Sequence, residues 1–182
     1  MYFDLIIAGF GGQGVLFIGN LLAQAAMSEG HKVTYMPVYG VEMRGGTANC
    51  TVVISDEEIG SPIIHRPHCA IVMNKPSLVK FGPRVRPDGL LIVNASLIQA
   101  ADVKIKGPEV LMVPSMDLAR EAGADRLANM AILGALAEKS GVTSVETLTR
   151  AMAESLPERA RKMVPINAKA MELGARFARN GR

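Results

Sequence analysis

A glycine-rich segment near the start of the chain limits the possible folds more than any other feature. Residues 9–14 read GFGGQG and lie between an apolar run at 4–9 and a run with helical spacing at 15–29. Glycines at the spacing G-x-G-x-x-G permit a tight turn from a strand into a helix, whose first N–H groups stay free for an anion such as phosphate. The segment therefore predicts a strand, a sharp turn and a helix in direct succession.

Short apolar runs recur along the first two thirds of the chain. Such continuous runs suit strands that are covered on both faces, as in a parallel sheet between helices. We expect strands at 4–9, 32–36, 48–54, 69–73, 90–94 and 110–113.

The last third of the chain has helical patterns. A helix is expected over 124–139, with Asp125 as its N-cap. Thr143 and Glu146 fit a capping box for the next helix. A final helix is expected from an apolar stripe at Ile166, Ala170, Leu173 and Phe177. Strand–helix alternation followed by helices predicts one α/β domain over 1–182, a three-layer Rossmann-like arrangement with a mostly parallel sheet and a helical C-terminal third.

Composition narrows the class of protein. Hydrophobic residues make up 49% and charged residues 20% of the chain, which is typical of a globular protein. No uncharged apolar run reaches the ~18 residues of a membrane span, and the first residues lack the pattern of a signal peptide, so we expect a cytoplasmic protein that does not enter a membrane. Two cysteines are too few to ligate an iron–sulfur cluster or to form a disulfide scaffold.

The net charge of +3 is unevenly distributed, because 150–182 is strongly basic. This segment could contact an acidic partner, or it could simply form a solvated helix surface. Aromatic residues, on which bases could stack, are only 4% of the chain, so we expect no binding of nucleic acid.

A nicotinamide dinucleotide site needs more than the glycines. Its second strand should end in an acid that holds the ribose hydroxyls, but the expected second strand runs Thr34-Tyr35-Met36-Pro37, and Glu42 follows only later. Two interpretations of the glycine segment stay open. It meets a ligand or a partner's active site, or it only lets the strand and the helix pack closely.

A second unusual segment, YGVEMRGG at 39–46, follows the expected second strand and should leave the sheet at the same edge. Arg44 suits phosphate or carboxylate. The alternative is a β-turn with a solvated pair of Glu42 and Arg44. Asn74 and Asn94 also end strands, where such residues line a crevice or, more often, cap the next helix or turn.

Catalytic groups are not evident. His31, His65 and His68 have no metal-ligand spacing with acids or cysteines, and no set of a nucleophile and a base can be argued. The residues indicate a binding edge without catalytic machinery.

Four motifs together resemble a known family. GFGGQGV at 9–15, YGVEMRGGTA at 39–48, ISDEEIGSP at 54–62 and ANMAILGAL at 128–136 are similar, in order and spacing, to the gamma subunits of 2-oxoacid:ferredoxin (acceptor) oxidoreductases. The resemblance is strongest to the 2-oxoglutarate (ketoglutarate) version. Pyruvate, branched-chain 2-oxoacid and indolepyruvate versions share the signatures.

The resemblance implies a subunit of an enzyme that oxidatively decarboxylates a 2-oxoacid to acyl-CoA and CO2 and passes electrons to ferredoxin. It implies alpha, beta and ferredoxin-like delta subunits as partners, which would hold thiamine diphosphate, Mg²⁺ and the iron–sulfur clusters. This chain is expected to bind none of these cofactors alone. The alternatives are a free-standing nucleotide-binding protein and a purely structural interaction module.

We hypothesise that the two loops face the active-site region and help to form the channel for coenzyme A, whose phosphates suit backbone N–H groups and an arginine. The candidate binding residues are Gly9, Gly11, Gly12, Gln13, Gly14, Tyr39, Gly40, Glu42, Arg44, Gly45, Gly46 and Asn74.

Overall fold

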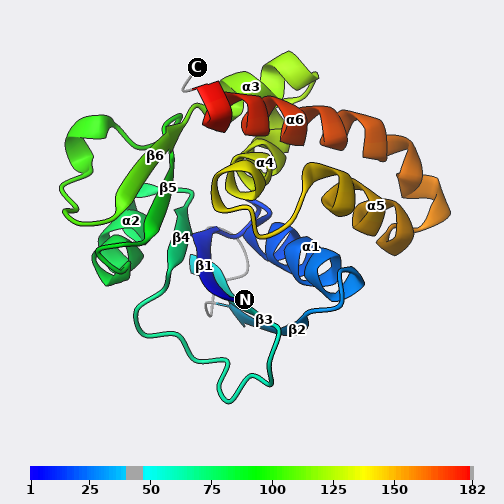
Figure 1. The fold of residues 1–182 in the computed structure, drawn as a ribbon. Helices are drawn as coiled ribbons and strands as arrows, with labels where there is room; N and C mark the ends of the chain where they lie inside the picture. The colour runs from blue at the N-terminus through cyan, green and yellow to red at the C-terminus, as the bar shows by residue number, and fades with distance from the viewer. Residues whose placement is uncertain (40–46, 181–182) are drawn as a thin grey trace.

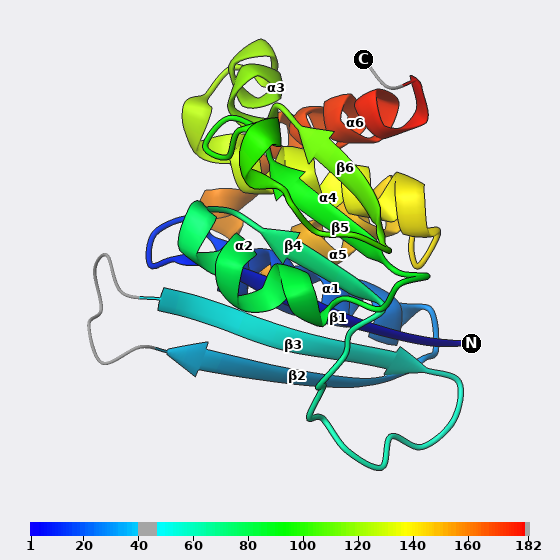
Figure 2. The same cartoon turned by 90° about the vertical axis from the view of Figure 1, so that its left-hand side faces the viewer.

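A computed structural model describes residues 1–39 and 47–180. Within them, six strands form one sheet in the order β2-β3-β1-β4-β5-β6 (Figures 1 and 2). Of the described strand pairs, those that include β3 are antiparallel and the others are parallel, so the expected mostly parallel sheet is confirmed. The strands are β1 (Tyr2–Phe10), β2 (Lys32–Tyr39), β3 (Thr47–Ser55), β4 (Cys69–Val72), β5 (Leu90–Asn94) and β6 (Glu109–Val113).

Helices cover both faces of the sheet, which gives the expected three layers (Figure 1). One face carries α2 (Lys75–Phe81). The other face carries α1 (Val15–Ser28), α3 (Ser115–Ala122), α4 (Ala128–Ser140), α5 (Val145–Ser155) and α6 (Val164–Asn180).

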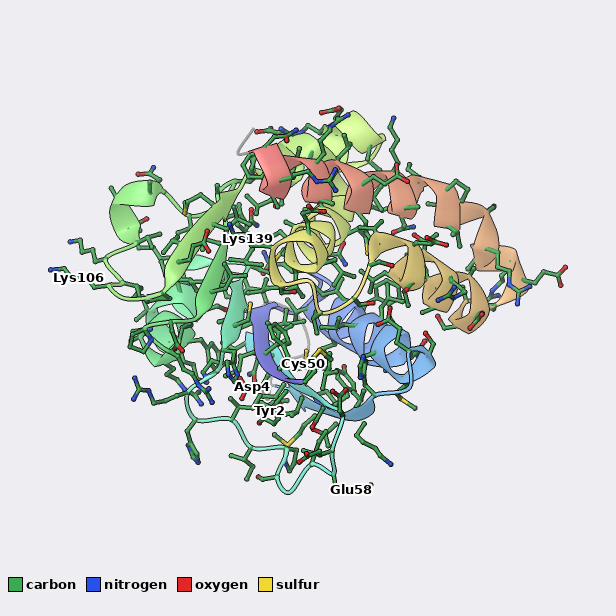
Figure 3. The ribbon with its side chains drawn as sticks, in the orientation of Figure 1. Tyr2, Asp4, Cys50, Glu58, Lys106 and Lys139 are labelled. Carbon is green, nitrogen blue, oxygen red and sulfur yellow. The ribbon has the colours of Figure 1, made fainter. Side chains whose placement is uncertain are left out.

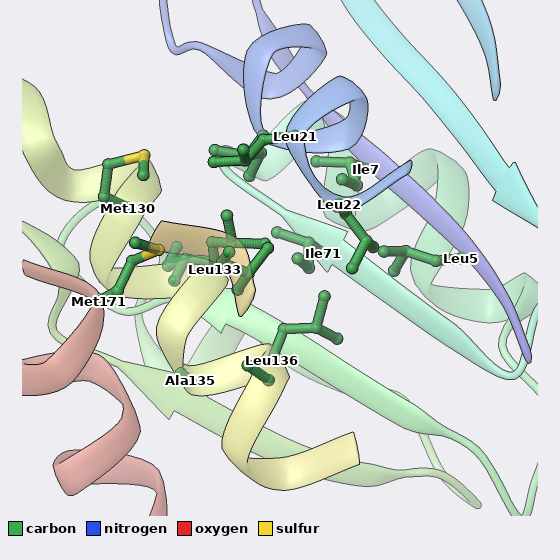
Figure 4. Close-up of a cluster of buried hydrophobic side chains, with 14 of the residues drawn as sticks. Leu5, Ile7, Leu21, Leu22, Ile71, Met130, Leu133, Ala135, Leu136 and Met171 are labelled. Atoms are coloured by element: carbon green, nitrogen blue, oxygen red, sulfur yellow. The ribbon is translucent and has the colours of Figure 1, made fainter. Parts of the chain in front are cut away.

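The core follows from the alternation of side chains along the strands. Leu5 and Ile7 of β1 pack under α1 and α4, whereas Ile6 and Ala8 point to the opposite face, toward α2. Figure 4 shows the larger of these two clusters, where side chains of α1, α4 and α6 meet those of the sheet. Because β1 is buried on both faces, its continuous apolar sequence is explained.

The C-terminal helices confirm the predicted helical third but correct two caps. Asp125 does not cap α4; it begins a 3-10 turn that precedes the helix, and its carboxylate accepts a hydrogen bond from Arg120 at 3.0 Å. Ser144, not Thr143, caps α5, because its hydroxyl accepts a hydrogen bond from the N–H of Thr147 at 3.0 Å.

The final apolar stripe is confirmed, since Ala170 and Leu173 are buried and Ile166 and Phe177 pack against the core. The bounds of two short helices, α2 and α3, were not predicted from the sequence, although Asn74 was expected to cap the helix or turn that follows it. No helix within the described residues is long and apolar enough to span a membrane.

Candidate functional site

The two segments singled out in the sequence meet the sheet at one edge. Phe10 at the end of β1 pairs with Thr47, and Tyr39 at the end of β2 pairs with Ala48. The stretch between β2 and β3 therefore leaves and re-enters the sheet beside the glycine segment, at the edge on the left of Figure 2. We call this the carboxyl edge, because β1, β2, β4, β5 and β6 all end there. Gly40, Glu42, Arg44, Gly45 and Gly46 lie outside the described residues.

The topology also marks the place along this edge where a ligand would bind. The parallel neighbours β1 and β4 are followed by helices on opposite faces of the sheet, so a topological switch point lies between these two strands. Open α/β sheets bind ligands in the crevice at such a switch point.

Internal packing accounts for two of the glycines. A Cβ on Gly9 would lie 2.7 Å from Oε1 of Gln13 and 2.9 Å from Cγ1 of Val15. Gly14 has a φ of 73° and a Cβ there would overlap the side-chain amide of Asn129. Gly12, with a φ of 97°, is exposed and has open space around its Cα. The close-packing interpretation therefore holds for Gly9 and Gly14, while Gly12 leaves room for another molecule.

Gln13 occupies the crevice at the switch point. Its Oε1 accepts hydrogen bonds from the N–H of Phe10 at 2.7 Å and from Nδ2 of Asn74 at 3.0 Å. Its Nε2 donates to the carbonyl of Met73 at 3.4 Å. The side chain thus joins the end of β1 to the end of β4, where a bound dinucleotide would have to pass.

Further buried polar side chains continue this chain of contacts along the edge. Asn74 caps α2, as predicted, by accepting a hydrogen bond from the N–H of Ser77 at 3.0 Å. Asn94 donates to the carbonyl of Met73 at 3.2 Å and accepts from the hydroxyl of Ser115 at 2.7 Å. The ends of β1, β4 and β5 and the start of α3 are therefore linked by one network of amides and hydroxyls, which we call the amide network.

Sequence reasoning missed two members of this edge. Ser115 is fully buried, and Asn129 reaches the carbonyl of Gly14 at 3.5 Å from α4. Asn129 lies within the ANMAILGAL motif, but nothing in the sequence shows its contact, because both side chains bind residues far away along the chain.

The side chains of the amide network are uncharged, so the network can bind by hydrogen bonding but offers no acid or base. The nearby charged side chain of Lys75, in the first turn of α2, is paired with Asp102 at 2.7 Å. Donors remain in the backbone: the N–H groups of Gly12 and of Val15, Leu16 and Phe17 in the first turn of α1 donate to no described residue. Free N–H groups at a helix N-terminus favour an anion.

The other chemistry-bearing residues lie elsewhere and have partners. Asp4 lies beside Tyr2 at the start of β1 (Figure 3), at the opposite edge of the sheet. Its carboxylate accepts a hydrogen bond from the N–H of His68 at 2.6 Å, and Arg86 contacts the His68 ring at 2.6 Å. His31 pairs with Asp56. Among the described residues, no group of three or more His, Cys, Asp and Glu could hold a metal ion.

Both cysteines are buried in the larger core cluster. Burial raises the pKa of the Cys50 thiol to about 12 and raises the pKa of the Cys69 thiol still further. Neither sulfur is a nucleophile or a cluster ligand in this arrangement.

A cavity of about 800 Å³ lies apart from the carboxyl edge, between the end of α1, the turn before α5 and the C-terminal half of α6. Its arginines are already paired, Arg176 with Glu121 and Arg179 with Glu138. We therefore place the candidate site at the carboxyl edge and not in this cavity.

Comparisons with known proteins agree on one family. The profile of the family described as pyruvate ferredoxin/flavodoxin oxidoreductase matches residues 4–177. Ketoisovalerate oxidoreductase subunit VorA of Methanothermobacter marburgensis is 39% identical over 95% of this chain, which spans 36% of that relative. The 2-oxoglutarate synthase subunit KorC of Methanothermobacter thermautotrophicus is 35% identical over 85% of this chain and 85% of its own length.

Solved structures share the fold. The gamma subunit of a keto/oxoacid ferredoxin oxidoreductase from Geobacter sulfurreducens has a TM-score of 0.80 and 25% identity, and covers 97% of this chain and 98% of its own. The 2-oxoglutarate:ferredoxin oxidoreductase from Magnetococcus marinus, with 2-oxoglutarate, coenzyme A and succinyl-CoA bound, has a TM-score of 0.88 and 22% identity over 98% of this chain and 31% of that one. The chain thus spans about a third of its longer relatives.

Proposed function

The chain belongs to the pyruvate ferredoxin/flavodoxin oxidoreductase family, and we propose that it is the gamma subunit of a 2-oxoacid:ferredoxin oxidoreductase complex. The observation that carries the proposal is the match over 4–177, together with relatives such as KorC that have nearly the length of this chain. The complex would oxidatively decarboxylate a 2-oxoacid to acyl-CoA and CO2 and pass electrons to ferredoxin.

The proposed substrate is 2-oxoglutarate. KorC relatives, which match this chain along most of their length, support it. VorA relatives of higher identity favour ketoisovalerate as the second candidate. Rates of the purified complex with 2-oxoglutarate, ketoisovalerate, pyruvate and indolepyruvate decide between them, since the true substrate should have the highest kcat/KM.

The described residues of this chain do not fit an iron–sulfur cluster or a metal ion. Its two thiols are buried, and its described residues include no cluster of metal ligands. In line with the family resemblance, we propose that thiamine diphosphate, Mg²⁺ and the iron–sulfur clusters belong to the partners, which we take to be alpha, beta and delta chains.

The proposed contribution of this chain is to bind coenzyme A from the carboxyl edge. The free N–H groups of Gly12 and of the first turn of α1 can face a phosphate, and Arg44 comes from the neighbouring segment. Gln13 argues against a free-standing dinucleotide-binding protein, because it occupies the switch-point crevice.

Arg44→Ala tests this role in the assembled complex. Losing one charge-assisted contact of about 1.5–3 kcal/mol should raise KM for coenzyme A at least about tenfold. The KM for the 2-oxoacid should not change, and Arg66→Ala, in the exposed loop before β4, is the matched control. An unchanged KM for coenzyme A would show that Arg44 has no such role.

Purification of the tagged chain from its own cells tests the complex itself. We expect a thiamine-diphosphate-binding chain and an iron–sulfur chain to accompany it. The isolated chain should bind neither NAD nor thiamine diphosphate in calorimetry. Tight NAD binding, or recovery without those partners, would contradict the proposal.

A further inference from the structure

Helix α1 has an unusual surface for an exposed helix. None of its residues, VLFIGNLLAQAAMS, is charged, although one stripe of the helix reaches solvent. In that stripe the side chains of Phe17 and Met27 are 42% and 62% exposed, Asn20 is exposed and Gln24 is half-buried. Solvated helix faces normally carry charges, whereas aromatic and methionine side chains without charges are typical of the centre of an interface.

The spacing of the stripe suits contact with another helix. Positions 17, 20, 24 and 27 alternate steps of three and four, which is the seam that packs in paired helices. The neighbouring positions Ile18, Leu21 and Ala25 are buried against this chain's own core. Apart from the exposed Ser28 and the partly buried Leu16 at its two ends, the stripe is what α1 can offer to another molecule.

The stripe is complementary to itself when one copy is reversed. Residue 22 lies midway between 17 and 27 and also midway between 20 and 24. Two antiparallel copies of α1 centred there would pair Phe17 of one chain with Met27 of the other, and Asn20 with Gln24. Methionine sulfur against an aromatic ring is a favourable contact, and a two-fold axis repeats each pair.

The amides of the stripe have matching free groups. Within one helix, Nε2 of Gln24 donates to Oδ1 of Asn20 at 2.7 Å. Nδ2 of Asn20 and Oε1 of Gln24 then have no partner among the described residues. In the antiparallel pair each free donor lies opposite the other copy's free acceptor, so the pair would gain two hydrogen bonds.

We propose that α1 is a contact between two copies of this chain, related by a two-fold axis and antiparallel along the helix. The proposal is independent of the proposed function. A 14-residue helix is about 21 Å long, and one seam of that length buries less than the roughly 800 Å² per partner of a typical stable interface. Pairing of the isolated chains should therefore be weak and concentration-dependent.

Cysteine cross-linking of the full chain tests both contact and direction. Asn20→Cys and Gln24→Cys chains, distinguished by a mass tag, are mixed and oxidised mildly. Antiparallel pairing predicts the mixed disulfide dimer as the main product, because two copies of position 20 are offset by about 6 Å along the axis. The native thiols do not interfere, since Cys50 and Cys69 are buried.

Two controls make the result decisive. Val79→Cys, at a 69% exposed position on α2, should give no mixed dimer above background with Asn20→Cys. Adding Phe17→Glu to the Asn20→Cys chain should lower the yield about tenfold or more, because it places an unpaired charge in the seam.

Three outcomes would overturn the proposal, provided that circular dichroism shows folded variants. They are preferential Asn20–Asn20 cross-links, which indicate a parallel pair, no cross-link above the Val79→Cys background, and cross-links from α1 to a different chain in the purified complex.

Discussion

Buried amide side chains hold the carboxyl edge of the sheet. Asn94 has almost no exposed surface, yet it donates to Met73 and accepts from Ser115 and from the N–H of Ser96. A buried polar group is tolerated when its polar atoms have hydrogen-bond partners, and removal of one member takes a buried partner from the others. The amide network therefore fixes where Gln13 and the glycine segment lie.

Asn94→Ala should destabilise the chain by about 2–4 kcal/mol, because the Ser115 hydroxyl and the Met73 carbonyl lose a buried partner. The midpoint of urea unfolding measures the effect. Gln99→Ala, an exposed amide without a side-chain hydrogen bond among the described residues, should shift stability by less than about 0.5 kcal/mol. Equal effects of the two changes would mean that the amide network contributes nothing.

At the scale of elements, the helices α4 and α6 lie in close backbone contact. Gly134 of α4 faces the carbonyl of Met171, and Gly174 of α6 faces the carbonyl of Ala131; a Cβ at either glycine would overlap that carbonyl. The two helices can therefore cross with their backbones in contact only while both positions are glycine.

Gly134→Ala and Gly174→Ala should each destabilise the fold by roughly 1–3 kcal/mol, since overpacking of a close contact exceeds the ~1 kcal/mol that alanine gains in a helix. Thermal unfolding measures this. Gly60→Ala is the control, because a Cβ there meets open space. Stabilisation by either helical substitution would show that the crossing can relax.

An ion pair between the same two helices makes the stability of the fold depend on pH. Arg179 of α6 donates to both carboxylate oxygens of Glu138 of α4, at 2.8 and 2.7 Å, and holds the pKa of Glu138 below its ordinary value of 4.5. Because the folded pKa is depressed, this contribution is present above pH 4.5 and is lost as the pH falls through the folded pKa.

Arg179→Met should therefore be less stable than the parent chain near pH 6, and the difference should shrink as the pH is lowered toward 3. Urea unfolding at a series of pH values follows it. A difference that stays constant with pH would rule out the ion pair as its source.

At the scale of the whole molecule, the two thiols report on the integrity of the core. Cys50 of β3 and Cys69 of β4 lie in the same buried cluster, under α1 and α4. Neither can meet a reagent while the helical layer stays in place.

At pH 8 neither thiol of the native chain should react with a disulfide reagent, and both should react in denaturant. The raised pKa of Cys50 means that the folded chain keeps its proton when the unfolded chain releases it. The free energy of unfolding should consequently fall as the pH rises from about 9 toward 12. Rapid labelling at pH 8 without unfolding would contradict this packing; Asn20→Cys, on the surface, supplies the reference rate.

The local pattern of apolar residues in the sequence was enough to predict much of the fold. The apolar runs located all the described strands to within a few residues, the helical stripes located α1, α4 and α6, and a capping-box signal located α5. The helices α2 and α3 escaped notice because a helix of seven or eight residues completes only two turns and has too little periodicity to detect. The cap of α5 was misplaced by one residue because Thr143 and Ser144 are chemically alike. Ser144 has the extended backbone of an N-cap, and its hydroxyl accepts the hydrogen bond from Thr147.

The sequence by itself determined the strand–turn–helix unit and the cap at Asn74, because each depends on residues close together along the chain. Only the tertiary structure decided between the two roles of the glycine segment, since it shows that Gly9 and Gly14 allow close packing and that Gly12 is exposed. Gln13 meets Asn74 across 61 positions and Asn129 meets Gly14 across 115. Contacts over such separations leave no periodicity in the sequence, since the sheet order and the packing of α4 bring the partners together.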